Sequence, residues 1–283
     1  MEARWWTKDK EMAVRCHLCF RQCSLAPGQT GVCGVRHNEN GELKSPYLGQ
    51  FCSLAVDPIE KKPLYHWQPG TSILSLGSLG CTMRCPFCQN ASIAQPVKIP
   101  AMRSLTIEEC IALCREYKLS SLAFTYNEPT LQAEFICSGG AQLQEAGIAT
   151  VLVTNGMFSD EVAAEFVKHV SALNIDVKTF NARNYTRMGG DLERVKRNVE
   201  MFVKAGRHVE VTRLLVPKLA DDPEDFMEFV RWLSNLSPDI PLHLSRYFPA
   251  HNYAEPPTSL NLLDRFAELA RKYLRHVYLG NVG

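Results

Sequence analysis

Three cysteines, Cys81, Cys85 and Cys88, lie within the short stretch CTMRCPFC. Thiolates are soft ligands for zinc and for iron–sulfur clusters, and a structural zinc ion or an ordinary 4Fe-4S cluster takes four protein ligands. Three cysteines on one loop would therefore leave one iron of a cluster free to bind a substrate or a cofactor. Alternatively, a fourth ligand from elsewhere in the chain completes a zinc site or an electron-transfer site.

The residues around these cysteines suit a loop at the end of a strand. Gly77 and Gly80 allow the backbone to turn tightly after the apolar run SILSLGS, because glycine adopts positive φ angles without steric cost. Pro86 keeps the loop from continuing as a helix, since proline lacks an amide donor. The Cys-x3-Cys-x2-Cys spacing is short enough to wrap one cluster.

A second group of thiols precedes these in a glycine-rich stretch. Its Cys-x2-Cys-x3-Cys-x9-Cys spacing fits a closed tetrahedral zinc site or an auxiliary iron–sulfur cluster, and a site without metal is the third alternative. Cys52 or His17 could replace one of the four ligands. The four cysteines of this set are Cys16, Cys19, Cys23 and Cys33.

The overall composition limits the class of protein and of partner. The chain has 283 residues, 46% of them apolar, which is enough for one large α/β domain and a small lobe. Its 31 basic and 30 acidic residues nearly cancel, which argues against a nucleic-acid or membrane-surface partner. The start lacks a secretory signal, and no run approaches the roughly 20 apolar residues that span a bilayer. We expect a cytoplasmic protein with reduced thiols and a small-molecule or protein partner.

Two regions differ in the pattern of their apolar residues. Residues 1–70 are rich in Cys, Gly and turn residues and predict a small Cys-rich N-terminal lobe. In residues 71–283, apolar strand-like runs alternate with segments of helical periodicity. The runs are SILSLGS, SSLAFTY, ATVLVTN, ALNIDVK, HVEVTRLLV, PLHLSRYF and HVYLGNV. Helices are expected at roughly 106–119, 130–146, 159–169, 191–205, 222–236 and 259–274, several with a capping signal at the start.

This βα repeat predicts a mainly parallel sheet, and polar residues favour a barrel over a flat sheet. Nearly every strand ends in a polar residue, as expected where the C-terminal ends of barrel strands converge, whereas a flat doubly wound sheet has one switch point. Six units are fewer than the eight of a closed barrel, so we predict an open, partial (β/α)6 TIM-like barrel. The Pro-bounded segment 57–70 is expected as a lid over its mouth.

The stretch CTMRCPFC resembles the signature of the radical S-adenosylmethionine (SAM) superfamily, and the resemblance covers nearly the whole chain. Together the matching stretches resemble the radical SAM member of the AmmeMemoRadiSam group, which is similar to the pyruvate formate-lyase activating enzymes. The resemblance implies a partial barrel of the radical SAM type, with a 4Fe-4S cluster on Cys81, Cys85 and Cys88 and SAM as cofactors. The matching stretches are RCHLCFRQCSLAPGQTGVCGVR, VDPIEKKPLYHWQPGT, GCTMRCPFCQN, FTYNEPT and NIDVK.

The resemblance also implies SAM-binding residues at two strand ends. At the place of the superfamily's Gly-Gly-Glu, Asn127 or Glu128 is expected to contact the amino group of SAM, with a plain helix cap as the alternative. Asp176 and Lys178 match an Asp-x-Lys that holds SAM in the activating enzymes, the lysine at its carboxylate. A buried structural ion pair is the alternative for these two residues.

Three further matches complete the implied SAM site. Thr154 and Asn155 match a Thr-Asn-Gly at the end of the third strand. His243 matches a histidine that holds SAM from the sixth strand, although a core histidine fits this position equally well. Phe87 matches an aromatic residue that supports the adenine, although a phenylalanine also simply fills space.

The resemblance thus implies an enzyme that reductively cleaves SAM and abstracts a hydrogen atom from a substrate. The nearest specific precedent is abstraction from a protein glycyl site, as in the activating enzymes, with an electron donor such as flavodoxin or ferredoxin. The ferredoxin-like insert that those enzymes often carry does not follow Cys88 here, so a small-molecule or other protein substrate stays open. The alternative from another class is a non-catalytic metal-binding module that binds a partner.

Overall fold

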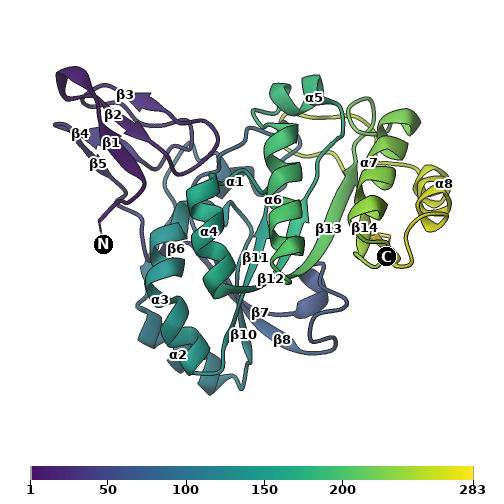
Figure 1. The fold of residues 1–283 in the computed structure, drawn as a ribbon, viewed down its shortest axis with the longest axis horizontal. Helices are drawn as coiled ribbons and strands as arrows, with labels where there is room; N and C mark the ends of the chain where they lie inside the picture. Colours follow the sequence, from purple (N-terminus) through teal and green to yellow (C-terminus); the bar gives the residue numbers. More distant parts are fainter. Residues whose placement is uncertain (1, 283) are drawn as a thin grey trace.

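The computed structural model describes residues 2–282 and centres on one large curved sheet (Figure 1). Within these residues the strand order is β15-β14-β13-β12-β11-β10-β8-β7. From β8 to β15 neighbouring strands are parallel, and β7 pairs antiparallel with β8 at one edge. The strands are β7 (Ser53–Pro58), β8 (Ser72–Gly77), β10 (Ser121–Phe124), β11 (Ala149–Thr154), β12 (Val170–Asp176), β13 (His208–Leu215), β14 (Leu242–Arg246) and β15 (Val277–Gly280).

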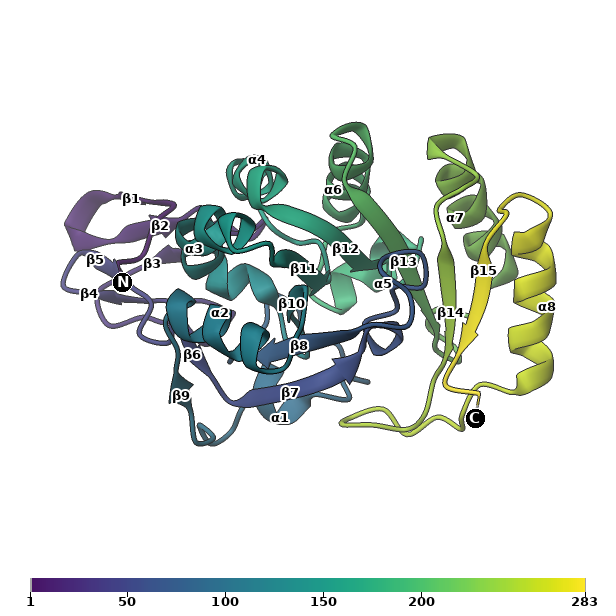
Figure 2. The same cartoon turned by 90° about the horizontal axis from the view of Figure 1, so that it is seen from below.

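Helices cover the outer face of this sheet, between successive parallel strands (Figure 2). They are α2 (Ile107–Glu116), α3 (Ala133–Glu145), α4 (Asp160–His169), α6 (Leu192–Lys204), α7 (Pro223–Leu236) and α8 (Leu260–Arg271). The sheet curves without closing, and β7 and β15 form its two edges. The predicted α/β fold with a partial barrel is therefore confirmed. The short helices α1 (Ala91–Ala94) and α5 (Ala182–Arg187) were not predicted, because such short segments show no clear helical period.

Local sequence signals explain where these helices begin. Thr106 and Glu109 form a capping box at the start of α2. Asp222 caps α7 and is followed by Pro223 at the first helical position, as the sequence predicts. Ser159 and Ser259 cap α4 and α8 through their hydroxyl groups. Each cap satisfies amide groups that a helix N-terminus leaves without an internal partner, and so it fixes the end of a βα connection.

The N-terminal lobe lies at one end of the barrel, drawn in purple in Figure 1. It contains the antiparallel strands β1 (Trp6–Lys8), β2 (Val14–Cys16) and β3 (Ser24–Leu25), and the hairpin β4 (His37–Glu39) and β5 (Glu42–Lys44). Outside it, β6 (Gln50–Phe51) pairs with β9 (Arg103–Ser104). The predicted boundary at residue 70 does not coincide with the edge of the sheet, because β7 pairs along its whole length with β8. The division into two domains at that residue stays a prediction.

The segment after β7 closes the N-terminal end of the barrel. Ile59 and Leu64 are fully buried and pack with inward-facing residues of four strands. Those strand residues are Ile73, Ala123, Val151 and Ala172, with Trp67 packed beside them. The expected lid over the mouth is therefore wrong. The apolar side chains of this segment fill the barrel interior at the opposite end, and we call residues 59–67 the floor segment.

A buried carboxylate ties the floor segment to the barrel. Glu210 on β13 accepts hydrogen bonds from the backbone amides of Tyr65 and His66 at 3.0 and 2.8 Å. It also contacts the Nε2 atoms of His208 and His243 at 2.9 and 2.6 Å. Burial alone would raise the pKa of Glu210, but these four donors lower it to about 2. Glu210 therefore holds β13, β14 and the floor segment together as a charged group.

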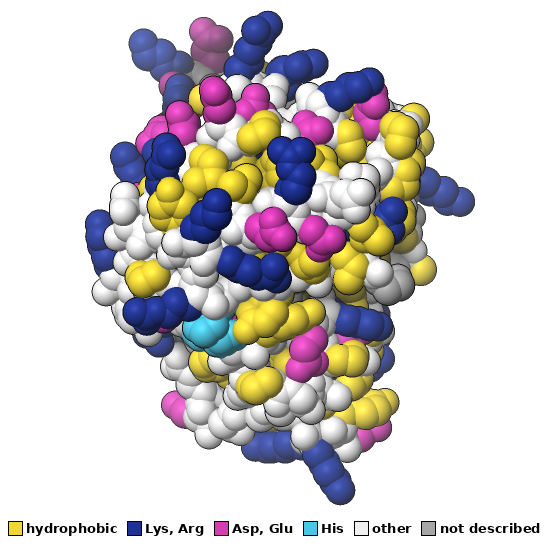
Figure 3. All heavy atoms as spheres, turned by 90° about the vertical axis from the view of Figure 1, so that its right-hand side faces the viewer, with side chains coloured by type: hydrophobic (Ala, Val, Ile, Leu, Met, Phe, Trp, Pro, Cys, Tyr) yellow, Lys and Arg dark blue, Asp and Glu magenta, His cyan; other side chains and the backbone are white. Residues whose placement is uncertain are grey.

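On the face of the molecule that includes α8, basic and acidic side chains are interspersed with hydrophobic ones, and neither charge sign forms a continuous patch (Figure 3). This agrees with the formal net charge of +1. Among residues 2–282, no helix combines the length and apolar character needed to cross a bilayer.

Substituting Glu210 by Gln should destabilise the protein at neutral pH. Because the folded pKa of about 2 lies below the usual 4.5, the carboxylate stabilises the fold above pH 4.5 and loses this effect as the pH falls from 4.5 to 2. The shift corresponds to roughly 3 kcal/mol. Thermal unfolding of both proteins at pH 7 and pH 3 should show a gap that narrows at pH 3. Asp239→Asn, at an exposed ion pair with Arg275, is the control, and an equal gap at both pH values would contradict this account.

Candidate active site

A cavity of about 310 Å³ opens at the C-terminal ends of the barrel strands. Its lining comes from the loop after β8 and from the ends of β10, β11, β12, β13 and β14, which lie far apart in the sequence. The structure brings together ten of the predicted site residues at this cavity: Cys81, Cys85, Phe87, Cys88, Asn127, Glu128, Thr154, Asn155, Asp176 and Lys178.

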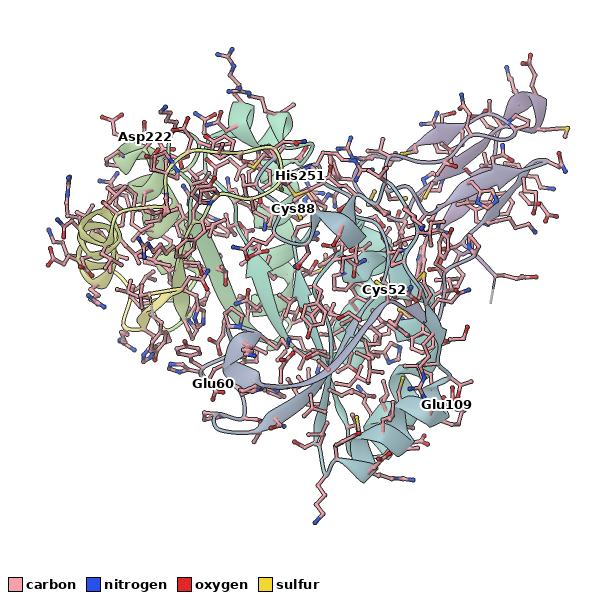
Figure 4. All side chains as sticks on the ribbon, turned by 180° about the vertical axis from the view of Figure 1, so that it is seen from behind. Cys52, Glu60, Cys88, Glu109, Asp222 and His251 are labelled. Carbon is pink, nitrogen blue, oxygen red and sulfur yellow. The ribbon has the colours of Figure 1, made fainter. Side chains whose placement is uncertain are left out.

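The loop with the three cysteines, residues 78–90, is called the cluster loop. It leaves the end of β8 through Gly80, whose φ of +85° favours glycine. A Cβ atom at Gly80 would lie 2.5 Å from the carbonyl oxygen of Cys33, so no other residue fits there. At the far side of the loop, the amide of Asn252 donates to the carbonyl of Pro86 at 2.8 Å. Figure 4 labels Cys88 and His251, which both lie at this end of the barrel.

The three thiols fit an iron–sulfur cluster by their surroundings. Cys81 accepts hydrogen bonds from the amide of Met83 at 3.4 Å and from the side chain of Asn155 at 3.5 Å. Such N–H donors stabilise a thiolate, which is the form that binds metal. Burial raises the pKa of Cys85 to about 11, although the nearby Lys178 acts in the opposite direction. The thiols must therefore lose protons when metal binds.

Asn127 and Glu128 use their side chains to hold the protein itself. Asn127 accepts from the amide of Ser78 at 2.9 Å and donates to the carbonyl of Gly80 at 3.0 Å, so it fixes the start of the cluster loop. The buried carboxylate of Glu128 accepts from the hydroxyl of Thr154 at 2.8 Å and from the amide of Asn155 at 2.9 Å. Both residues line the cavity, yet their acceptor atoms already have donors. Their predicted contacts with SAM stay predictions.

Asp176 and Lys178 form an ion pair that faces the cavity. The Nζ atom of Lys178 lies 2.6 Å from the Oδ2 atom of Asp176, and the two side chains are 16% and 30% exposed. Burial lowers the pKa of Lys178, but Asp176 and Cys85 raise it above its usual value. The lysine therefore stays charged beside the cysteine loop. Because both ends of the pair reach the cavity, they can bind a charged ligand, which a fully buried structural pair could not.

Asn155 and Phe87 line the cavity beside the cluster loop. The side-chain nitrogen of Asn155 donates to the hydroxyl of Thr82 at 3.0 Å, which ties the end of β11 to the loop. Phe87 is almost fully buried and meets the ring of Tyr253 edge to face at 6.3 Å. Its ring is held firmly, as a platform for a flat ligand would need to be.

His243 is the predicted site residue that the structure does not place at the cavity. Its Nε2 atom lies 2.6 Å from Glu210, and its ring packs against Tyr65 with centroids 4.7 Å apart. Ser245, two residues further on the same face of β14, lines the cavity instead. One such step along a strand is about 7 Å. His243 thus lies one step deeper in the barrel than the lining of the cavity, and its expected contact with SAM stays a prediction.

Sequence reasoning missed three interacting residues at the inner side of the cavity. Tyr126 has a φ of +70°, and the amide of Asn127 bonds to the carbonyl of Thr125 across it, which is a rare and strained turn for a bulky residue. Its hydroxyl donates to Asp57 at 2.6 Å, and Lys62 lies 2.7 Å from the same carboxylate oxygen. No sequence spacing links β7, the floor segment and the turn after β10, so only the fold reveals this group.

The four thiols of the lobe also meet, around a second cavity beside the cluster loop. Cys16, Cys19, Cys23 and Cys33 line it together with Arg36 and Thr82. The suggested substitutes lie elsewhere: Cys52 donates to the carbonyl of Ser78, and His17 bonds to Thr7. As the side chains stand in residues 2–282, no three from His, Cys, Asp and Glu converge on a single metal ion.

Several proteins are similar to this chain in sequence or in fold. Residues 76–233 match the radical SAM superfamily. The uncharacterised protein MJ0808 of Methanocaldococcus jannaschii is 38% identical over 287 residues, which cover 99% of this chain and 85% of that protein. The pyruvate formate-lyase-activating enzyme of Staphylococcus aureus is 26% identical over 181 residues, which cover 56% of this chain and 68% of the enzyme.

The crystal structure of Streptococcus suis SuiB bound to S-adenosylmethionine is similar in fold. Its TM-score is 0.58 at 16% identity, over 73% of this chain and 49% of SuiB. At this level of identity, the likeness concerns the fold alone.

Two neighbouring lysines allow a matched test of the group formed by Asp57, Lys62 and Tyr126, which we call the inner group. Lys62 is 3% exposed and close to Asp57, whereas Lys61 is 68% exposed and 3.6 Å from the same carboxylate. Lys62→Met should leave Asp57 without its main counter-charge and cost roughly 3 kcal/mol of unfolding free energy. Lys61→Met should cost less than about 1 kcal/mol. Urea unfolding at pH 7 measures both, and equal costs would refute the asymmetry. Adding Asp57→Asn to Lys62→Met should restore part of the loss.

Proposed function

This chain belongs to the radical SAM superfamily, and on that premise we propose that Cys81, Cys85 and Cys88 hold its 4Fe-4S cluster and leave one iron open for SAM. The protein is an enzyme whose cofactors are this cluster and SAM. The bound cluster supplies the electron that cleaves SAM reductively, which gives a 5′-deoxyadenosyl radical that abstracts hydrogen from a substrate. A purely structural metal-binding module is therefore set aside.

One observation carries the assignment of the site. The three thiols and the ion pair of Asp176 and Lys178 line the same cavity, at the mouth of a partial barrel. The thiols are ligands for iron, and the ammonium group of Lys178 is a partner for the carboxylate of SAM.

The other predicted site residues at the cavity have proposed roles that follow from their contacts. Phe87 supports the adenine ring, since it is buried and held by Tyr253. Asn127 and Glu128 position the cluster loop and the end of β11, and Thr154 and Asn155 complete that wall. SAM contacts the sides of these residues that line the cavity, while their bonded atoms keep the wall rigid.

The substrate that we propose is a glycyl site in a partner protein, as the likeness to a pyruvate formate-lyase-activating enzyme suggests. We further propose that the chain is the radical SAM member of the AmmeMemoRadiSam group, that it acts in the cytoplasm, and that flavodoxin or ferredoxin donates the electron. The stretches VDPIEKKPLYHWQPGT and GCTMRCPFCQN support the subgroup.

A small-molecule substrate is the second candidate, and the inner group of Asp57, Lys62 and Tyr126 favours it. Lys62 and Tyr126 line the inner side of the cavity and offer an ammonium group and a phenol. A polar small molecule would find partners there that a glycyl backbone does not require. Incubation of the enzyme with deuterated candidates of both classes separates them, because the true substrate transfers deuterium to 5′-deoxyadenosine.

Removing the charge of Lys178 should weaken SAM binding. A hydrogen bond to a charged group contributes about 1.5–3 kcal/mol, so Lys178→Met should raise the Kd for SAM roughly 10- to 100-fold. Equilibrium dialysis with anaerobically reconstituted protein of equal iron content measures this. Lys204→Met, a 75% exposed lysine on α6, is the matched control. Unchanged affinity in Lys178→Met would remove this residue from the site.

Removing one cluster thiol should abolish the reaction. Cys85→Ala leaves too few ligands for the cluster, so reconstituted protein with dithionite and SAM should release no 5′-deoxyadenosine. Cys114→Ala, a buried thiol on α2 outside the cavity, should keep the activity. If Cys85→Ala still cleaves SAM, the proposed cluster ligands are wrong.

A further inference from the structure

The four lobe cysteines come from two short loops that face each other. Cys16 ends β2 and Cys23 precedes β3, and the amide of Cys16 donates to the carbonyl of Cys23 at 2.9 Å. Cys33 lies in a turn that the amide of Gly34 closes onto the carbonyl of Gly31 at 2.9 Å. Both loops are thus fixed by backbone bonds, and the cavity between their thiols holds about 20 Å³. This is room for one ion or one water molecule.

Arg36 gives a second, independent sign of a missing negative group. Its side chain is 1% exposed and lines the four-thiol cavity. Its Nη2 atom pairs with Glu134 at 3.0 Å, but within residues 2–282 its Nε and Nη1 atoms have no hydrogen-bond partner. A buried guanidinium with unpaired N–H groups is costly unless an acceptor lies beside it. Thiolate sulfurs bound to a metal would supply such acceptors.

We propose that Cys16, Cys19, Cys23 and Cys33 form a tetrathiolate metal centre whose negative charge Arg36 balances, and that this centre holds the cluster loop in place. A zinc ion fits the cavity of about 20 Å³, and with four thiolates it carries a net charge of about −2. A 4Fe-4S cluster has the same ligand chemistry and charge, but it is larger and requires the two loops to move apart. Since the thiols as they stand do not converge on one ion, binding requires rotation of their side chains.

The lobe contacts the cluster loop at several points. Arg21 donates to the carbonyl of Thr82 at 2.8 Å, and Arg84 donates to the carbonyl of Val32, next to Cys33. Thr82 itself lines the four-thiol cavity. A metal that fixes the positions of Cys19 and Cys33 therefore also fixes the backbone against which residues 80–84 pack. This part of the inference rests on the proposed role of the cluster loop.

Metal and sulfide analysis of the full chain, purified and reconstituted anaerobically, tests the centre. Wild-type protein should contain about four irons at the cluster loop. In addition it should contain either one zinc ion or about four further irons with sulfide, bound at the lobe. Cys19→Ala with Cys33→Ala should lose that increment alone, while Cys114→Ala keeps it. Cys85→Ala should instead lose only the irons of the cluster loop, so the two sites fail separately. Wild-type protein with four irons and no zinc would overturn the proposal, whether or not the double variant folds.

Hydrogen exchange read by mass spectrometry tests the link to the cluster loop. Removal of the lobe metal, by the double variant or by a chelator, should speed exchange in peptides from residues 78–90 about tenfold or more. Peptides from α8, at the opposite end of the molecule in Figure 1, should exchange at unchanged rates. Arg36→Met removes the charge that balances the metal centre, and Glu134→Gln is added so that the partner carboxylate of Arg36 is not left buried and unpaired. This double variant should lose its lobe metal to the chelator faster than the wild-type protein. Unchanged exchange in 78–90 after metal loss would overturn the link.

Discussion

The cluster loop has almost no regular secondary structure, so its shape depends on hydrogen bonds from the elements around it. Asn127 at the end of β10 fixes its start, Asn155 after β11 bonds to Thr82 and Cys81, and Arg21 of the lobe holds the carbonyl of Thr82. These partners come from three separate parts of the chain. A loop with three metal ligands can therefore keep its form only because the barrel and the lobe are already in place, which is how a site reaches the precision that its chemistry needs.

The barrel has opposite demands at its two ends. At the mouth, Lys178 and Asp176 stay partly exposed, so their charges remain available to a ligand. At the floor, Glu210 has every oxygen bonded and is fully buried, so its charge serves the fold. The difference follows from position along parallel strands, since C-terminal ends converge on a functional site and N-terminal ends are filled for stability.

The βα order, the helix caps and the cysteine loop could be predicted because each leaves a local pattern in the sequence. The rest depends on contacts between distant segments. The sequence of β7 does not show that this segment joins the sheet, because that depends on its pairing with β8. The floor segment was misplaced because its apolar residues follow neither a helical nor a strand period. The depth of His243 along β14, where it bonds to Glu210 below the cavity, also depends on the fold and could not be read from a resemblance. Tyr126 could have been suspected only from its positive φ angle, which a sequence does not show.

The central claim is that the polypeptide leaves one iron of the cluster at Cys81, Cys85 and Cys88 for SAM. The most direct measurement is electron–nuclear double resonance of the reduced holoprotein with SAM labelled with nitrogen-15 in the amino group and oxygen-17 in the carboxylate. We predict hyperfine coupling from both labels in the wild-type protein. A reduced cluster that shows no coupling to either label in the presence of saturating SAM, with its fourth iron bound by a side chain, would contradict the account.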